Sequence, residues 1–302
     1  MSTAAVGAKT VSQIIAEVTA GTLPATPAMK VLPLESNTLK LSKGSLTDNS
    51  IRGDRMGGDV RPGMNKIDGD IKFNYRCTEF DELLENMFMG AWTTNVLKAA
   101  STVKSHAMEI GHTDVNQYSQ FLGLRANTLD ISAKPGDLIK CTMTFMGMSK
   151  TDYAGTTAAQ SSAMYTKEPF DSFNGSIQEG GSASAIITGF DIKMSNNLAE
   201  STVLFNANRT GITAGNVSVS GSITAQFIDA VLFNKFKNGT NSAISITLTD
   251  PAGKSHTILI PKIVYTDSDL SIANESELTL TLTFNGQYDS TTGTKIQITR
   301  VP

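Results

Sequence analysis

One nine-residue pattern occurs twice in the chain and constrains the fold more than any other feature. Residues Ile139–Gly147 read Ile-Lys-Cys-Thr-Met-Thr-Phe-Met-Gly, and residues Leu278–Gly286 read Leu-Thr-Leu-Thr-Leu-Thr-Phe-Asn-Gly. In both copies apolar and polar side chains alternate, which is the period of a β-strand with one buried face. Each copy ends on Phe, one further residue and Gly. Because the pattern closes each half of the chain, we predict a duplicated β domain.

The order of the predicted elements repeats as well. The first half is predicted to run strand, long polar stretch, Gly-led strand and helix, at Thr38–Ser42, Lys43–Asp68, Gly69–Tyr75 and Thr78–Met89. The second half is predicted to repeat this order at Ile186–Met194, Ser195–Ser220, Gly221–Phe227 and Ile228–Lys237. Further strands then lead to the Thr-rich strand in each half. The plentiful Gly, Thr, Ser and Asn and the few aromatic residues suit β structure with many turns.

These observations predict a mainly β (α+β) fold. It would have two similar β-sandwich or half-barrel domains, each with one flanking helix and long loops. The 302 residues are enough for two medium-sized domains. The predicted boundaries are an N-terminal arm at 1–33, a first domain at 34–148, a linker at 149–168 and a second domain at 169–302. Gly and Pro interrupt the arm, and the linker is rich in Ser, Thr and Ala without an apolar period.

Each predicted helix carries one apolar stripe, which we expect to pack on the sheet. The residues of the two stripes are Phe80, Leu83, Leu84 and Phe88, and Val231, Leu232 and Phe236. Thr78 is predicted to be the N-cap of the first helix, with Asp81 reaching back to it. Gly90 is expected to end that helix.

The polar stretch Lys43–Asp68 is longer than the ~12–15 residues usual for an unstructured loop, so a functional or disordered loop is expected. Its arginines are interleaved with aspartates, and no Gly-x-x-x-x-Gly-Lys pattern is present. These features favour a solvated or partner-binding loop over a nucleotide site.

No constellation of residues in the sequence points to catalysis or to a bound cofactor. The histidines His106, His112 and His256 have no spacing that completes a metal site, and the two cysteines match no metal or redox motif. Both cysteines are predicted to be reduced and structural. We therefore predict no enzyme, no cofactor and no metal.

The composition also limits the partners that the chain can bind. The formal net charge of −3 gives no reason to expect a surface that binds duplex DNA. No secretory signal is apparent at the N-terminus, and no run approaches the ~18 apolar residues that span a membrane. We expect a non-enzymatic structural protein that is soluble when synthesised. The alternatives are a surface fibre or adhesin, or a β-sandwich hydrolase that uses Asp114 or His112.

Several stretches together resemble the major tail tube proteins of long-tailed bacteriophages. They are Glu17–Pro24, Ser50–Arg52 with Asp54 and Arg55, Gly69–Tyr75 running into Leu83 and Leu84, and Met108–Ile110 with Thr113–Val115, Tyr118 and Phe121–Gly123. The likeness covers most of the first half and extends more loosely over the second. One departure is that Ser195–Ser220 contains only Arg209 where the first half has an arginine-bearing loop.

The resemblance implies a virion protein, made in the host cytoplasm, that forms rings stacked into a hollow tail tube. Viral DNA would leave through the tube without specific binding. Other expected partners are the tail initiator, tape-measure and terminator proteins. A ring of three two-domain chains would have approximate sixfold symmetry. A different structural component of the tail is the alternative within this resemblance.

Two groups of residues receive a role in this hypothesis. The expected ring-to-ring contacts come from the arm at 2–33 and from a loop group that contains Arg52, Asp54, Arg55 and Arg61. The residues expected to face the channel are Lys140, Thr142, Thr144, Thr279, Thr281 and Thr283. Deleting Lys43–Asp68 is expected to spare the fold and to stop tube growth.

Overall fold

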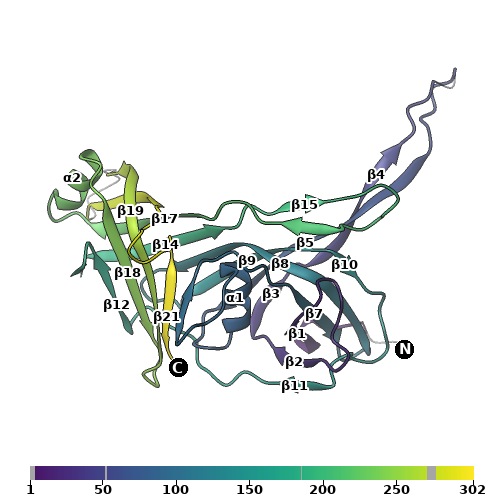
Figure 1. Ribbon diagram of the computed structural model, residues 1–302, viewed down its shortest axis with the longest axis horizontal. Coiled ribbons are helices and arrows are strands. Elements are labelled where there is room, and N and C mark those ends of the chain that lie inside the picture. Colours follow the sequence, from purple (N-terminus) through teal and green to yellow (C-terminus); the bar gives the residue numbers. More distant parts are fainter. Residues whose placement is uncertain (1–3, 52, 185, 271–276) are drawn as a thin grey trace.

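The computed structural model describes residues 4–51, 53–184, 186–270 and 277–302. Within these residues the chain is mainly β, with two short helices. The predicted mainly β class is therefore confirmed. Figure 1 shows long strands that cross the middle of the molecule, smaller groups of strands below them and to one side, and a hairpin that projects away from the body.

One continuous antiparallel sheet, here called the shared sheet, joins the two halves. Its first-half strands are β3 (Leu34–Asn37) and β4 (Lys40–Thr47), then β5 (Val60–Asn74), β9 (Lys140–Gly147) and β8 (Gln117–Ala133). Its second-half strands are β14 (Ile187–Ser195), β17 (Ser218–Gln226), β20 (Thr279–Gly286) and β19 (Ser255–Asp269). The halves meet where β8 pairs with β14.

One end strand of each half, β8 in the first and β19 in the second, also enters a second layer. The first part of β8 pairs with β7 (His106–His112) and β10 (Ser149–Lys150), and β7 continues into β1 (Thr10–Ala16), β2 (Ala28–Val31) and β11 (Ser161–Ala163). The first part of β19 pairs with β18 (Ser242–Thr249) and β21 (Gln297–Val301). Beyond these lie β12 (Gly175–Glu179), β13 (Ser182–Ala183) and β6 (Val96–Lys98). The remaining elements are a 3-10 turn at Gly7–Lys9 and a separate hairpin of β15 (Ala199–Ser201) and β16 (Gly211–Thr213).

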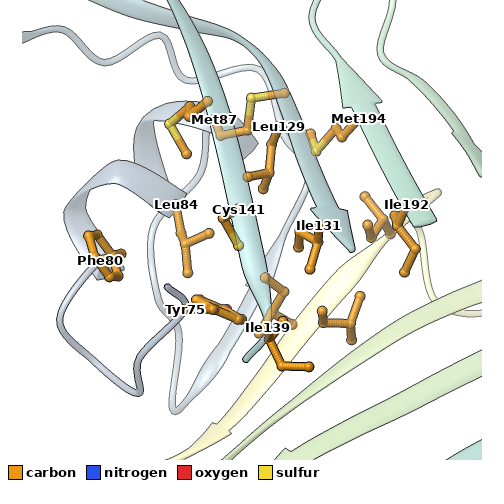
Figure 2. Packing of buried hydrophobic residues seen from close by; sticks show 14 of the residues in the cluster. Tyr75, Phe80, Leu84, Met87, Leu129, Ile131, Ile139, Cys141, Ile192 and Met194 are labelled. Atoms are coloured by element: carbon orange, nitrogen blue, oxygen red, sulfur yellow. The ribbon is translucent and has the colours of Figure 1, made fainter. Parts of the chain in front are cut away.

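Helix α1 (Asp81–Phe88) covers the first-half part of the dry face of the shared sheet. Figure 2 shows Leu84 and Met87 of this helix pointing toward Cys141 of β9 and Leu129 of β8. The stripe residues Phe80, Leu83, Leu84 and Phe88 are all buried. The apolar face of β9 therefore packs between α1 and the rest of the core.

The start of α1 differs from the capping pattern that the sequence predicts. Phe80 occupies the N-cap position without a side-chain cap, and Thr78 has a left-handed backbone with φ of 61°. Asp81 does not reach back to Thr78; its carboxylate is paired with Arg300 of β21. Met89 ends the helix in the left-handed conformation. A contact with a distant strand has replaced the local cap.

The second helix, α2 (Val231–Lys237), begins later than predicted and is only partly covered. Leu232 is buried and Phe236 packs against the core, but the side chain of Val231 is 56% exposed. The expectation that Val231 packs on the sheet is therefore wrong. Val231 is the first residue of the helix, and its side chain projects into solvent.

Two segments expected to be irregular contain strands. The predicted arm supplies β1 and β2, and its Ile14 and Met29 are buried in the sheet rather than loose. The predicted linker at 149–168 supplies β10 and β11.

The polar stretch Lys43–Asp68 is largely a hairpin of β4 and β5, which projects from the body in Figure 1. Ile67 at the base of this hairpin is fully buried. The expectation that deleting Lys43–Asp68 spares the fold is therefore wrong, because the deletion would remove part of the core.

Candidate functional site

The shared sheet has one dry face and one polar face. In β9, Cys141, Met143 and Phe145 are buried, while Lys140 is exposed and Thr142 and Thr144 are half-buried. In β20, the predicted residues Thr279, Thr281 and Thr283 are exposed or half-buried between buried neighbours. All six residues expected to face a channel therefore lie on the polar face, opposite the helix.

The four-stranded units of the two halves have the same pairing register. Gly69 of β5 lies opposite Phe145 of β9. In the second half, Gly221 of β17 lies opposite Phe284 of β20. A Cβ added to Gly221 would lie 2.6 Å from the Phe284 ring and 2.2 Å from the carbonyl oxygen of Asp191. The aromatic ring and the neighbouring strand thus require glycine at this position of β17.

The final glycine of each repeated pattern has an equivalent packing role. A Cβ on Gly147 would lie 2.6 Å from Cγ2 of Ile67 in β5. A Cβ on Gly286 would lie 3.0 Å from Cβ of Val219 in β17. In both halves a β-branched side chain, Ile67 of β5 or Val219 of β17, fills the space above the final glycine of the repeated pattern.

Irregularities in the ladders also occur at matching places. The β8–β9 register shifts between Ala126 and Thr128, and the β19–β20 register shifts between Tyr265 and Asp267. The β3–β5 register shifts between Leu34 and Ser36, and the β14–β17 register shifts between Ile187 and Gly189. Each bulge bends its strand locally, so the two units have the same bends at the same positions.

The junction between the halves is a regular antiparallel ladder. Residues 128–133 of β8 pair with residues 190–195 of β14. On the dry side, Ile131 lies opposite Ile192, and Figure 2 shows both in the core beneath the sheet. On the polar side, Nζ of Lys193 lies 3.4 Å from Oδ1 of Asp130. Burial, together with the charge on Asp130, raises the pKa of Asp191 above its usual range.

A buried arginine pins the long loop of the second half to the first half. Arg209 is 4% exposed and lies in the segment that joins β15 to β16. Its Nη1 donates to the carbonyl oxygens of Ile67 at 2.7 Å and Gly147 at 3.1 Å. Its guanidinium also makes a two-pronged contact with the carboxylate of Asp68, and its Nε donates to Glu200 at 2.8 Å. Burial alone would lower the pKa of Arg209, but the hydrogen bonds with both carboxylates raise it.

Sequence reasoning noted Arg209 only as a departure from the first half. The available signal was that a long polar segment contains a single arginine. Its partners in the first half lie 62 to 142 positions away in the sequence, so spacing could not identify them.

Two buried histidines take part in packing rather than in a site. Nδ1 of His256 lies 2.7 Å from the hydroxyl of Tyr75, which links the two halves. Nδ1 of His106 accepts from the side-chain amide of Asn86 at 2.7 Å. Burial lowers the pKa of His256 to about 3 and that of His106 to about 4, so both rings are neutral at physiological pH.

Three of the four predicted ring-to-ring residues of the loop group lie on the projecting hairpin. Asp54, Arg55 and Arg61 are exposed there, and Arg52 lies outside the described residues. The same hairpin exposes large apolar side chains, which are Leu46, Ile51, Met56 and Val60. Isolated exposed apolar residues are ordinary, but a group of them on one projection is typical of an interaction surface.

The titratable groups give no sign of a metal centre in the part of the chain that the structure describes. There, no group of three or more His, Cys, Asp or Glu side chains could hold a metal ion. Cys77 and Cys141 are free and buried, and burial raises the pKa of the Cys77 thiol to about 11. Neither described helix is long and apolar enough to cross a membrane.

The comparison with protein families decides the class of the chain. The model of a family described as phage tail tube protein matches residues 7–287, which is nearly the whole chain. The chain belongs to the phage tail tube protein family. No curated protein matches the chain.

The resemblance stated from the sequence is thereby confirmed. A phage tail tube protein is a structural component of the tail, so this protein belongs to the virion tail and to a non-enzymatic family. The long loops and the polar face of the shared sheet are the features of this tail tube protein that call for a functional explanation.

Proposed function

We propose that this tail tube protein assembles with copies of itself into rings that stack into a hollow tube. The observation that carries the proposal is the shared sheet, which has matching four-stranded units side by side and an unpaired edge strand at each end among the described residues. An unpaired edge needs a partner strand or a cover. Addition of further copies at both edges would extend the sheet, and its curvature would close it into a ring.

Three chains per ring is the stoichiometry that we propose. The matching registers and bulges support a duplication within the chain. Two equivalent units per chain can occupy alternating positions around an axis, so three chains would give approximate sixfold symmetry. The domain boundaries predicted from the sequence remain part of this proposal.

The polar face would line the channel, with Lys140, Thr142, Thr144, Thr279, Thr281 and Thr283 on it. Strand pairing places further charged residues on the same face, namely Asp68, Asp70, Asp130, Asp191, Asp267 and Asp269 with Lys40, Lys66, Lys72 and Lys193. Hydroxyls and nearly balanced charges, without a basic stripe, give a surface to which a polyanion does not adhere. The DNA would therefore pass through during ejection without specific binding.

Stacking of rings would use the projecting hairpin of β4 and β5. Its exposed apolar side chains, together with Arg52, Asp54, Arg55 and Arg61, are proposed to contact the next ring. The exposed parts of the predicted arm would contribute as well. The tail initiator, tape-measure and terminator proteins are the other proposed partners, and synthesis would take place in the host cytoplasm.

Negative-stain electron microscopy of the concentrated protein tests the proposal. In one variant, residues 48–59 between β4 and β5 are replaced by Asn-Gly; in a second, they are replaced by a Gly-Ser loop of equal length. The wild type should form hollow tubes. Both variants should keep the far-ultraviolet circular dichroism of the wild type but should not grow tubes, because the contacting side chains are gone. Normal tubes from both variants would show that the hairpin does not join the rings.

A further inference from the structure

The junction inside the chain is a template for the junction between chains. Because the two four-stranded units have the same register, each strand at the internal junction has a counterpart at an outer edge. The counterpart of β8 is the last part of β19, where Asp269 corresponds to Asp130. The counterpart of β14 is the continuous edge of β3 and β4, where Lys40 corresponds to Lys193.

This correspondence follows from the ladders once the two units are aligned on the repeated pattern. Thr142 lies opposite Asp130, and Thr281 lies opposite Asp269, at the equivalent position of the repeated pattern. On the other side, Lys193 lies opposite Ser220, and Lys40 lies opposite Asp68. Asp68 and Ser220 each precede the glycine of the Gly-led strand.

Both outer edges expose apolar side chains whose internal counterparts are buried. Leu41 of β4 is 38% exposed, whereas its counterpart Met194 is buried. Leu270, which follows β19, is 37% exposed, whereas its counterpart Ile131 is buried. Among the described residues, the outer side of each edge has no strand paired to it. A second copy of the chain supplies the missing strand in each case.

We propose that β19 of one copy pairs antiparallel with the edge of β3 and β4 of the next copy, in the register that places Asp269 opposite Lys40. In this register Leu270 lies opposite Leu39, as Ile131 lies opposite Ile192 inside the chain. Ser268 lies opposite Leu41. The inference deepens the proposed ring and rests on it, because it names the two surfaces and the register that close the ring.

The ion pair selects the register more than it stabilises the contact. The internal pair is half-exposed, with relative exposures of 51% for Lys193 and 31% for Asp130. Such pairs contribute little to stability. A slip by one residue would turn the dry side chains to the polar face. A slip by two residues would separate Asp269 from Lys40, so the charges and the leucines together specify one pairing.

Cysteine cross-linking tests the register directly. The variant Lys40→Cys with Asp269→Cys places the two thiols opposite each other across the proposed junction. The control variant Ser42→Cys with Asp269→Cys has the same chemistry displaced by two residues. Both native cysteines are buried, so they do not compete. After assembly and mild oxidation, the paired variant should link neighbouring chains about tenfold faster than the control, because a disulfide needs closely opposed Cα atoms.

Charge exchange gives a second readout that needs no disulfide. Lys40 and Asp269 are exposed in the single chain, so changing them should not affect folding. Lys40→Asp and Asp269→Lys should each slow ring formation, and the double exchange should restore the wild-type rate. Light scattering measures the rates at low salt, where such pairs act most strongly.

Three outcomes decide the inference. Faster cross-linking of the paired variant, with rescue by the double exchange, supports the register. Tubes in which the displaced control cross-links at least as fast would overturn the register and leave the tube intact. A wild-type protein that forms no rings under any assembly condition would overturn both the proposed function and the register.

Discussion

Replacing Arg209 with methionine should destabilise the protein because the guanidinium is buried and fully engaged. Methionine keeps most of the volume but removes every donor. The carbonyls of Ile67 and Gly147 then lose a charged partner, and an unsatisfied buried polar group costs about 1–3 kcal/mol. Asp68 and Glu200 are 45% and 34% exposed, so water can replace much of what they lose. We expect a decrease of about 3 kcal/mol in the free energy of unfolding.

Urea denaturation measures this change, and fluorescence of Trp92, the single tryptophan, reports it. The urea midpoint should fall, while the slope of the free energy of unfolding against urea concentration should stay unchanged. A lower midpoint at constant slope reports a change in stability alone. Arg55→Met is the matched control, since Arg55 is exposed on the projecting hairpin. Arg209→Lys should lower the free energy of unfolding by about half as much as Arg209→Met, because lysine keeps the charge but not the forked geometry. An Arg209→Met variant within about 0.5 kcal/mol of the control would refute the argument.

Two further predictions concern packing and pH. Gly221→Ala should destabilise the protein by roughly 2 kcal/mol or more, because its Cβ would overlap the carbonyl oxygen of Asp191. Gly57→Ala, where a Cβ meets nothing within 4 Å, should have almost no effect on the urea midpoint, and equal shifts would contradict the packing argument. Burial lowers the pKa of His106 to about 4, with the charge of Lys104 adding to the effect. The unfolded chain therefore takes up this proton first. The stability that comes from keeping His106 neutral is complete above about pH 6.5. As the pH falls from about 6.5 to 4, the free energy of unfolding decreases by on the order of 3 kcal/mol. Urea midpoints between pH 7 and 4.5 should fall less in His106→Gln than in the wild type, and parallel pH profiles would show that His106 is not buried neutral.

The parts of the fold that sequence could predict are those with a local periodic signal. Alternation marked β9 and β20, together with their dry and polar faces, because the pleat has a period of two residues. The stripe of Leu83, Leu84 and Phe88 likewise marked α1. Gly69 and Gly221 were recognised as equivalent positions of equivalent strands. The reason for glycine required the tertiary structure, because a Cβ would meet the backbone of Leu39 at Gly69 and the Phe284 ring and the Asp191 carbonyl at Gly221.

The parts that could not be predicted depend on contacts between distant residues. Strand β4 is exposed along its length and has no alternation, so only its start fell in the predicted strand Thr38–Ser42 and the part from Lys43 on was expected to be a loop. The prediction of a helix cap at Thr78 was wrong because Asp81 is paired with Arg300, which is 219 positions away. The pairing of β8 with β14, which joins the halves, is likewise set by tertiary structure. It was this junction, rather than a single motif, that identified the two outer edges.

Electron cryomicroscopy of the assembled protein tests the central claim, that the shared sheet closes into a ring with its polar face inward. We predict a hollow tube with three chains per ring and an unbroken sheet across each chain boundary. Thr142 and Thr281 should face the channel, and α1 should lie outside the barrel. A ring whose channel is lined by the α1 side of the sheet, or whose neighbouring chains share no strand pairing, would contradict it.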